Sequence, residues 1–519
     1  MSIENQNPIP VIIGVGQIND RDVNDKKAVG LDSLGLMEAA LRAADADAGG
    51  GWLARLDSLG VVDQISYPEL GDVSVPLAKR VGAAPRICYK SGYASGDSPV
   101  LLLHEAANRI GAGEIQVAAI VGGEALRTAA RRMANGAQAG GAAQAGGASR
   151  AGSASTDNAV RAVALRRGPS YRHRYGLVAP VDVYPLYENA GRAAYGQTLA
   201  QGQAESAEIW SRFSAVAEGN PGAWLRRRVS ADEIKTVSAA NRPIAFPYPK
   251  LMVANSSVNQ GAGFLVTSLA EARARGIAED RMIFVGQGAA AHEPVDLMAR
   301  ASFAESPSMA VSIRKALELN GLATADLDYV ELYSCFPCVP KMARRVLGWP
   351  VERAASVFGG LTFGGGPVGN YMSHAVVSMV LALRQTGRHG LLFANGGLAT
   401  HNHSMVLSRG PIAANVFPQR FDYQAEADSL RGAAPAIQED YLGPATVETY
   451  TVLYDREGAP QQGAVIGRAP SGARFIAKVP AADSATIHWL TSGEQEPVGA
   501  PGTAVQGADG DTVWVRPVR

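Results

Sequence analysis

Short apolar runs alternate with amphipathic segments along most of the chain. Six runs have the length and composition of buried strands: residues 11–16, 59–62, 117–123, 282–286, 327–332 and 391–394. Between them, apolar residues recur at helical spacing, most clearly over about 98–112 and about 371–386. Strands separated by helices predict an α/β fold around a buried sheet. Because the pattern occurs twice, we expect two halves of similar architecture.

The region between the two halves has a different composition. Residues of about 129–156 are mainly Ala, Gly, Gln and Ser. Such a segment buries too little apolar surface to offset its ordering entropy, so we expect a mobile surface excursion there. Residues of about 182–225 are predicted to be largely helical, and the prolines of 242–249 then exclude a helix.

Beyond about residue 415 the helical periodicity stops. Four strand-like segments are separated by turn residues: 447–454, 463–466, 474–479 and 513–515. They predict a small all-β barrel or sandwich. We therefore divide the chain into residues 1–270, which include a helical excursion at about 126–250, residues 271–414, and a β-domain of residues 415–519.

Charge and composition exclude several functional classes. The 519 residues contain 48 Lys and Arg against 48 Asp and Glu, so the chain has no net positive charge with which to bind nucleic acid. No run approaches the ~18 apolar residues of a membrane span, and the first seven residues lack the pattern of a signal peptide. Three cysteines are too few for a disulfide framework. We expect a soluble, cytoplasmic protein.

Four segments, in order, resemble the active-site segments of the thiolase superfamily. Residues 93–98, followed by a helix, a strand and Gly122-Gly123-Glu124, resemble the nucleophile loop. Residues 255–263 resemble the "N-A-S-G-x-N-D-G-A-A" segment, and 312–332 resemble the helix leading into "E-L-N-E-A-F". Residues 359–369 resemble "G-G-x-x-x-x-G-H-P-x-G". The resemblance covers about 8–412 and implies two βαβ-type halves in α-β-α-β-α layers.

Two further segments narrow the resemblance. Tyr333-Ser334-Cys335-Phe336 is similar to the "H-D-C-F" loop of sterol-carrier-protein-type thiolases. Segments 449–452, 472–477 and 497–499 are similar to the oligonucleotide/oligosaccharide-binding (OB) proteins that partner some thiolase-like enzymes. The resemblance implies a thiolase-like protein of lipid metabolism with a fused OB-like domain. It also implies acyl-CoA as substrate or ligand, and a homodimer or a monomer.

The catalytic positions of the family carry other residues in this chain. Thiolases need a cysteine thiolate, oxyanion donors and a second acid/base. The resemblance places Tyr93 at the nucleophile cysteine and Tyr333 at the Asn or His that holds an oxyanion-site water. It places Gly366 at the histidine of "G-H-P" and Ala394 at the second cysteine. Standard thiolase chemistry is therefore not expected.

Three hypotheses remain open. The first, which we take as the main prediction, is an acyltransferase of the acetyl-CoA acetyltransferase type, with Cys335 as a displaced nucleophile and Cys338 as second choice. The second is a lyase in which Tyr333 and Tyr93 act as acid and base in a retro-aldol cleavage of a β-hydroxyacyl-CoA. A phenol, with a pKa near 10, needs oriented donors or a cation for that role. The third is an acyl-CoA-binding protein without turnover.

Other candidate residues surround these. His401 and His403 project to one face of a strand and supply the base lost at Gly366, or else belong to a polar surface loop. They are too sparse for a zinc site, and no metal is predicted. Residues 358–369 lack the pattern of a phosphate loop, but their backbone N–H groups are suited to binding a thioester oxygen.

Coenzyme A recognition completes the predicted site. The resemblance implies CoA contacts from the helical excursion and from Ser256 or Ser257. Arg227, within Arg226-Arg227-Arg228, is a candidate partner of the CoA phosphates, the alternative being a solvated helix end. No bound cofactor is predicted besides CoA or acyl-CoA as substrate or ligand.

Overall fold

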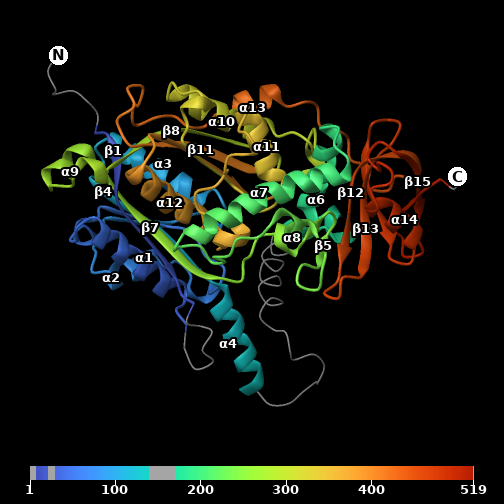
Figure 1. The fold of residues 1–519 in the computed structure, drawn as a ribbon, viewed down its shortest axis with the longest axis horizontal. Helices are drawn as coiled ribbons and strands as arrows, with labels where there is room; N and C mark the ends of the chain where they lie inside the picture. The colour runs from blue at the N-terminus through green and yellow to red at the C-terminus, as the bar shows by residue number, and fades with distance from the viewer. Residues whose placement is uncertain (1–7, 22–29, 140–169, 518–519) are drawn as a thin grey trace.

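The computed structural model describes residues 8–21, 30–139 and 170–517, in a main body and a smaller C-terminal lobe (Figure 1). The main body is built on a nine-stranded sheet of order β3-β2-β4-β7-β1-β8-β11-β10-β9. The strands are β1 (Pro10–Asn19), β2 (Ser58–Val61), β3 (Ile87–Lys90), β4 (Val117–Ala125), β7 (Asn259–Ser268), β8 (Ile283–His292), β9 (Tyr329–Leu332), β10 (His389–Gly396) and β11 (His401–Ser408).

The two halves of the main body repeat one topology. In the first half β1 is antiparallel to β7, β7 is antiparallel to β4, and β4 is parallel to β2. In the second half β8, β11, β10 and β9 follow the same pattern. The halves meet where β1 pairs with β8 at Val11 and Ile12. The expected architectural repeat is confirmed, and β3 is an additional edge strand of the first half.

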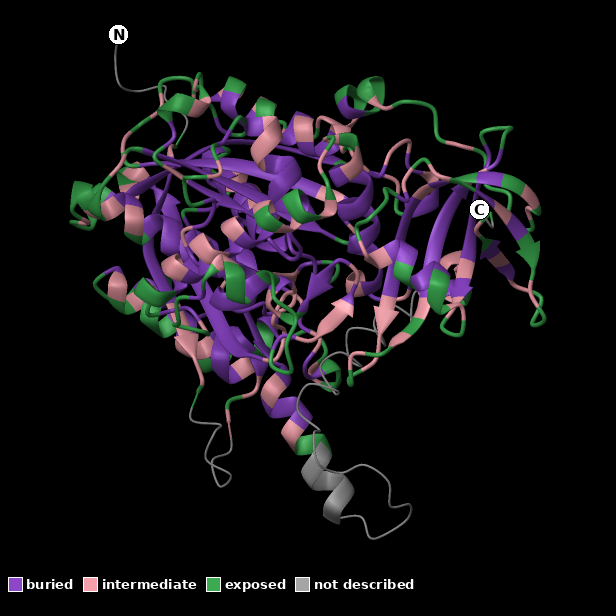
Figure 2. Cartoon of the chain, turned by 45° about the vertical axis from the view of Figure 1, so that its right-hand side comes forward, coloured by how far each residue is buried: buried purple, intermediate pink, exposed green. Residues whose placement is uncertain are grey.

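Helices cover both faces of this sheet. Helices α1 (Ser33–Asp47) and α10 (Pro307–Leu319) pack on the strands of their own halves, whereas α3 (Ser98–Gly111) and α12 (Tyr371–Gln385) contact strands of both halves and each other. Between Tyr371 and Leu383, α12 carries no Asp, Glu, Lys or Arg, as expected of a helix buried on nearly all sides. The buried residues accordingly concentrate at the strands and central helices (Figure 2).

The remaining helices of the main body are short or belong to the excursion. They are α2 (Ser74–Arg80), α4 (Leu126–Ala139), α6 (Pro180–Ala194), α7 (Leu199–Gly219), α8 (Ala231–Lys235), α9 (Leu269–Ala274) and α11 (Cys338–Leu347). The mobile excursion predicted at 129–156 is wrong for residues 129–139, which form part of α4. Alanine, which was taken there as a sign of low complexity, is also the strongest helix former. Residues 140–156 lie outside the described residues.

The C-terminal lobe is a small β-barrel. Its strands are β12 (Gly443–Tyr454), β13 (Pro460–Arg468), β14 (Arg474–Pro480), β15 (Pro501–Gln506) and β16 (Thr512–Val515), and the pairing of β12 with β13 closes the barrel. The predicted β-domain is confirmed. Strand β15 and two helices, α13 (Gln424–Leu430) and α14 (Ser484–Thr491), were not predicted from the sequence.

The barrel is joined to the main body through backbone and side chains. Strands β5 (Pro243–Ala245) and β6 (Tyr248–Pro249) of the excursion extend the barrel sheet at β12. The Arg474 guanidinium is fully buried, donates to the carbonyls of Met298 (2.7 Å) and Arg300 (2.6 Å), and pairs with Glu448. Among the described residues, no helix combines the length and apolarity needed to cross a bilayer.

Arg474 is therefore predicted to be a major stabilising contact between the two lobes. Arg474→Ala leaves two carbonyls and Glu448 without their buried donor, and we expect it to lower the free energy of unfolding by about 3–5 kcal/mol. Arg468→Ala is the matched control, because Arg468 pairs with the same Glu448 (2.7 Å) with its side chain 28% exposed, and should cost at most ~1 kcal/mol. Urea unfolding measures both, and equal losses would contradict the prediction.

Candidate functional site

Tyr93, on the loop that follows β3, is a candidate residue that contacts a histidine at the surface. Tyr93 is 40% exposed, and its Oη lies 2.5 Å from His401 Nε2. The two residues line a surface pocket of about 380 Å³ together with Val295, Gly397 and Thr400. The structure thus brings together Tyr93 and His401, which are 308 residues apart in the sequence.

A second histidine stands next to this pair. His401 begins β11 and pairs in register with His292 at the end of β8. The two Nδ1 atoms are 2.8 Å apart, and the rings are roughly perpendicular. Tyr93, His401 and His292 therefore form a continuous chain of hydrogen-bonding side chains. His292 was not a candidate from the sequence, because only the strand register places it beside His401.

Tyr333 is buried beneath the Tyr93 loop and does not line the pocket. A Cβ on Gly96 would lie 2.4 Å from Tyr333 Oη and 2.2 Å from the Asn395 carbonyl oxygen, so only glycine fits there. Burial, with the nearby Cys335 and Asp97, raises the pKa of Tyr333 well above its usual value. The idea that Tyr93 and Tyr333 face one substrate as a pair is therefore not supported, and Tyr333 is a neutral hydroxyl that packs against the loop.

Cys335 is buried between β9 and α11. Burial raises the pKa of its thiol to about 12, although a hydrogen bond with Tyr184 opposes the shift. The Tyr184 hydroxyl accepts from the Ala399 N–H (2.9 Å), and its ring stacks on Phe336. At neutral pH roughly one such thiol in 10⁵ is ionised. Because the thiolate is the nucleophile, this environment argues against Cys335 in acyl transfer.

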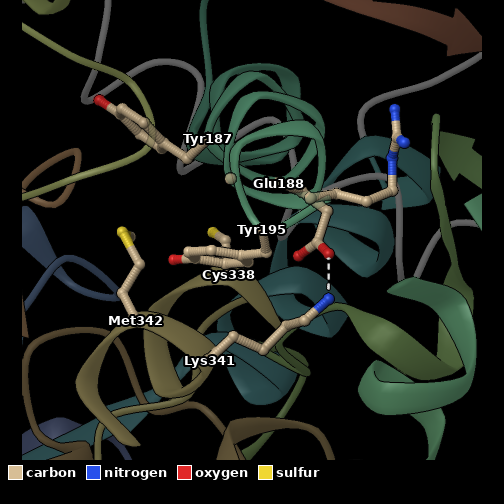
Figure 3. Close-up of a pocket in the computed structure, with 8 residues that line it drawn as sticks. Tyr187, Glu188, Tyr195, Cys338, Lys341 and Met342 are labelled. Atoms are coloured by element: carbon tan, nitrogen blue, oxygen red, sulfur yellow. Dashed lines mark hydrogen bonds and ion pairs between the residues drawn. The ribbon is translucent and has the colours of Figure 1, made fainter. Parts of the chain in front are cut away.

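Cys338 is no better placed. Burial raises the pKa of its thiol well above the usual value, and the negative charge of Glu188 adds to this. Its Sγ donates to the Tyr184 carbonyl (3.7 Å). Figure 3 shows Cys338 beside the ion pair between Lys341 and Glu188, whose charged atoms are 2.5 Å apart. The cavity here is about 10 Å³, room for one water molecule and no acyl group.

The glycine-rich run is tied down at the position of the lost histidine. The Gly366 N–H donates to the Asn255 carbonyl (2.8 Å), and the Asn255 N–H donates to Leu361 (3.0 Å). Gly366 therefore cannot offer its N–H to a thioester oxygen while this bond is made. Ser256 and Ser257 follow Asn255 directly and are half-buried beside this run.

Glu331, a residue missed by the sequence analysis, anchors the same run from below. It accepts from Ser356 Oγ (2.9 Å), from the Val357 N–H (2.9 Å) and from the Tyr371 hydroxyl (2.6 Å). Burial raises the pKa of this carboxyl to about 7. The signal available in the sequence was an acidic residue near the end of a predicted buried strand, ahead of a glycine-rich segment.

Arginines and a tryptophan gather near the glycine-rich run. Arg227 is exposed and pairs with Glu233 (2.8 Å), which raises the pKa of the guanidinium. The guanidinium groups of Arg21 and Arg127 each lie 5.8 Å from the Trp224 ring centroid. The Trp224 N–H donates to the Gly364 carbonyl (2.8 Å), which joins this cationic surface to the run. Three distant segments contribute to it, so the sequence pointed to Arg227 alone.

His403 is separated from the pocket although it lies two residues from His401. It is buried, and its Nε2 lies 3.0 Å from His104 Nδ1 on α3. Burial lowers the pKa of His403 to about 4 and that of His104 well below its usual value. The interpretation of His401 and His403 as part of a polar surface loop is therefore wrong, because both histidines lie in β11. The described residues contain no cluster of His, Cys, Asp and Glu suited to a metal ion.

The chain is similar in sequence and fold to known proteins. The family model described as the additional C-terminal domain of thiolase-like protein type 1 matches residues 425–511. The crystal structure of a monomeric SCP2-thiolase like protein type 1 from Mycobacterium smegmatis is 29% identical, with a TM-score of 0.81 over 99% of this chain and 100% of that chain. The chain is a thiolase-superfamily protein with an additional C-terminal domain.

More distant structures share the fold of the main body. The Ltp2-ChsH2(DUF35) aldolase is 18% identical with a TM-score of 0.56, over 78% of this chain and 99% of that chain. Human mitochondrial 3-ketoacyl-CoA thiolase is 14% identical with a TM-score of 0.57, over the same shares. No curated protein sequence matches the chain significantly.

The thiols of this thiolase-superfamily protein are predicted to be inert in the native state. Iodoacetamide at pH 7.5 should label the half-buried Cys88 slowly and leave Cys335 and Cys338 unmodified, because both are buried as neutral thiols. Intact mass should show one label on the native protein and three after denaturation, with Cys88→Ser as control. Rapid native labelling of Cys335 would restore the nucleophile hypothesis.

The buried His104–His403 pair predicts acid sensitivity. Since the folded pKa of His403 is about 4 and an unfolded histidine titrates near 6.5, the unfolded state binds the proton first as pH falls. Its contribution, up to roughly 3 kcal/mol, is present above pH 6.5 and is lost towards pH 4. Thermal unfolding should show a flatter pH dependence in His403→Gln and an unchanged one in His488→Gln, at an exposed position of α14. Equal slopes in all three proteins would contradict this.

Proposed function

We propose that this protein is an acyl-CoA-directed carbon–carbon lyase that cleaves a β-hydroxyacyl-CoA by a retro-aldol reaction. The observation that carries the proposal is the 2.5 Å contact between Tyr93 Oη and His401 Nε2 at the pocket. A phenol needs a partner to exchange protons at neutral pH, and a neutral imidazole is a suitable base. Of the candidate residues, this pair alone combines access to substrate with a proton acceptor.

The proposed chemistry needs only proton transfers. Tyr93 Oη takes the proton of the substrate β-hydroxyl while its own phenolic proton passes to His401 Nε2. The β-carbon becomes a carbonyl, the bond between α- and β-carbons breaks, and its electron pair forms the thioester enolate. One proton returned to the α-carbon releases an aldehyde or ketone and a shortened acyl-CoA. Oxidant, reductant and metal are not consumed.

The CoA moiety is proposed to bind along the glycine-rich run. Ser256 and Ser257 flank it, and Arg21, Arg127 and Trp224 present cationic and aromatic groups beside it. Guanidinium groups suit phosphates, and an aromatic ring suits an adenine base. Arg227 contributes charge at the edge, in competition with Glu233. We propose a cytoplasmic monomer, in keeping with the monomeric M. smegmatis structure.

The other hypotheses are weaker on physical grounds. Acyl transfer through Cys335 requires a thiolate that burial disfavours. A second candidate, an acyl-CoA-binding protein without turnover, is favoured by the occupied Gly366 N–H, because a thioester oxygen loses that donor.

Tyr93→Phe is the decisive variant for the lyase. With β-hydroxyacyl-CoAs of graded chain length, we expect release of an aldehyde or ketone and of a shorter acyl-CoA, measured by mass spectrometry. Tyr93→Phe should lower kcat by about 10²–10⁴-fold, because it removes the proton-transferring oxygen. Tyr333→Phe, at a residue outside the pocket, should change kcat by less than about threefold.

Three outcomes separate the hypotheses. Full activity of Tyr93→Phe contradicts the proposed chemistry. An acyl adduct that Cys335→Ala abolishes supports the transferase. Micromolar acyl-CoA binding without turnover supports the binding protein.

A further inference from the structure

His292 is the solvent-exposed end of the chain of contacts formed by Tyr93, His401 and His292. It is the last residue of β8, its side chain is exposed, and its Nδ1 lies 2.8 Å from His401 Nδ1. The tautomers follow from the contacts. When Tyr93 donates to His401 Nε2, the His401 hydrogen is on Nδ1 and points to His292 Nδ1. His292 then carries its own hydrogen on Nε2.

The backbone of His292 is held by the segment that leads into the additional C-terminal domain. Its N–H donates to Gln424 Oε1 (2.7 Å), and its carbonyl accepts from Gln424 Nε2 (3.1 Å) and from Arg431 Nη2 (2.7 Å). Arg431 also donates from Nε to the next residue, Glu293 (3.1 Å). The Gln424 amide and the Arg431 guanidinium thus hydrogen-bond the last N–H and carbonyl of β8, an interior strand, from outside the main sheet.

The same segment runs along β8. The Ala290 N–H donates to the Phe421 carbonyl (2.7 Å), and the Tyr423 N–H donates back to the Ala290 carbonyl (2.9 Å). Helix α13 begins at Gln424, immediately after these bonds. The position of His292 is therefore set jointly by β8 and by the first residues of the added region.

We infer that His292 passes the proton between the Tyr93–His401 pair and solvent, and that Gln424 and Arg431 of the added C-terminal region are positioning residues for this relay. The experiments on this inference that measure kcat rest on the proposed lyase function. The structural basis of the inference is the chain of contacts from Tyr93 through His401 to His292 and the grip on the His292 peptide.

The relay balances in protons. The phenolic proton moves to His401 Nε2, the His401 Nδ1 proton moves to His292 Nδ1, and the His292 Nε2 proton leaves to water. One proton enters the chain and one leaves it, so neither imidazole retains a charge. The reverse sequence returns one proton from water towards the enolate. A relay of this kind avoids leaving a positive charge on His401 between the Tyr93 hydroxyl and the His292 ring.

External rescue is the sharpest test of His292. In a buffer that is low in imidazole and does not itself transfer protons at the site, His292→Ala should lower kcat by about 10–100-fold with little change in KM. Added imidazole should restore the rate with saturation, because the vacated position is exposed, and should leave the wild type unaffected. His488→Ala, at an exposed histidine of α14, should behave as wild type. An undiminished kcat, or a loss that imidazole does not restore, overturns the relay.

The positioning role is tested by Gln424→Ala in the same assay. It should lower kcat by about 3–10-fold, and imidazole should recover part of the loss, because it replaces a misplaced His292. Gln461→Ala, which removes an exposed glutamine of the barrel, is the matched control. A loss equal in the two variants, or a loss in Gln424→Ala that imidazole leaves unchanged, overturns the positioning role.

A measurement without substrate keeps the relay and the lyase function distinguishable. Long-range ¹H–¹⁵N spectra of the full chain report the tautomer of each histidine. We expect the Nδ1–H form for His401 and the Nε2–H form for His292, with the His401 preference reduced in His292→Ala and the His292 preference reduced in Gln424→Ala. If the spectra behave so and no substrate is cleaved, the function fails and the relay stands. If the tautomers ignore both substitutions, the relay fails whatever the activity.

Discussion

The antiparallel register of β11 between β8 and β10 fixes the contacts on which the candidate site depends. Gly396 of β10 and His292 of β8 both pair with His401, so one residue receives a pocket on one side and a second imidazole on the other. A slip by one residue would turn His401 to the opposite face of the sheet. His403 lies two residues further along the same face, where the strand is covered and the imidazole contacts His104. Two histidines of one strand therefore differ in access to solvent, because His401 lines the pocket and His403 is buried.

Desolvation then decides which groups keep their chemistry. Cys335, Cys338 and Tyr333 are all held neutral by burial, whatever their positions in the family's active-site segments imply. Tyr93 is instead exposed at the pocket and has an imidazole partner. Exposure alone would leave a phenol inert at neutral pH, and an imidazole alone would lack the oxygen that contacts substrate. Their combination at one surface supports the proposed acid–base chemistry over thioester exchange.

Sequence patterns were sufficient for features that depend on local periodicity. The spacing of apolar residues identifies buried strands and helices, so the two halves and most barrel strands were predictable. Features that depend on long-range register were not. The contact between Tyr93 and His401, the role of His292 and the Glu331 anchor each join segments that only the folded sheet brings together. The prediction for the Ala-rich part of α4 failed for another reason, because alanine is common in low-complexity segments and in helices alike.

The added C-terminal region is bound into the main body too extensively to be an independent appendage. Its barrel sheet continues into β5, its Arg474 is buried against carbonyls of the main body, and the segment before the barrel grips the end of β8. The Arg474 contact satisfies two buried carbonyls, which separation of the lobes would leave without their donor, whereas the hydrogen bonds to the His292 backbone lie at the surface. The grip on His292 is the contact that reaches the pocket. Fusion in one chain therefore does more than keep two folds together, because it fixes the backbone beneath the outermost residue of the proposed relay.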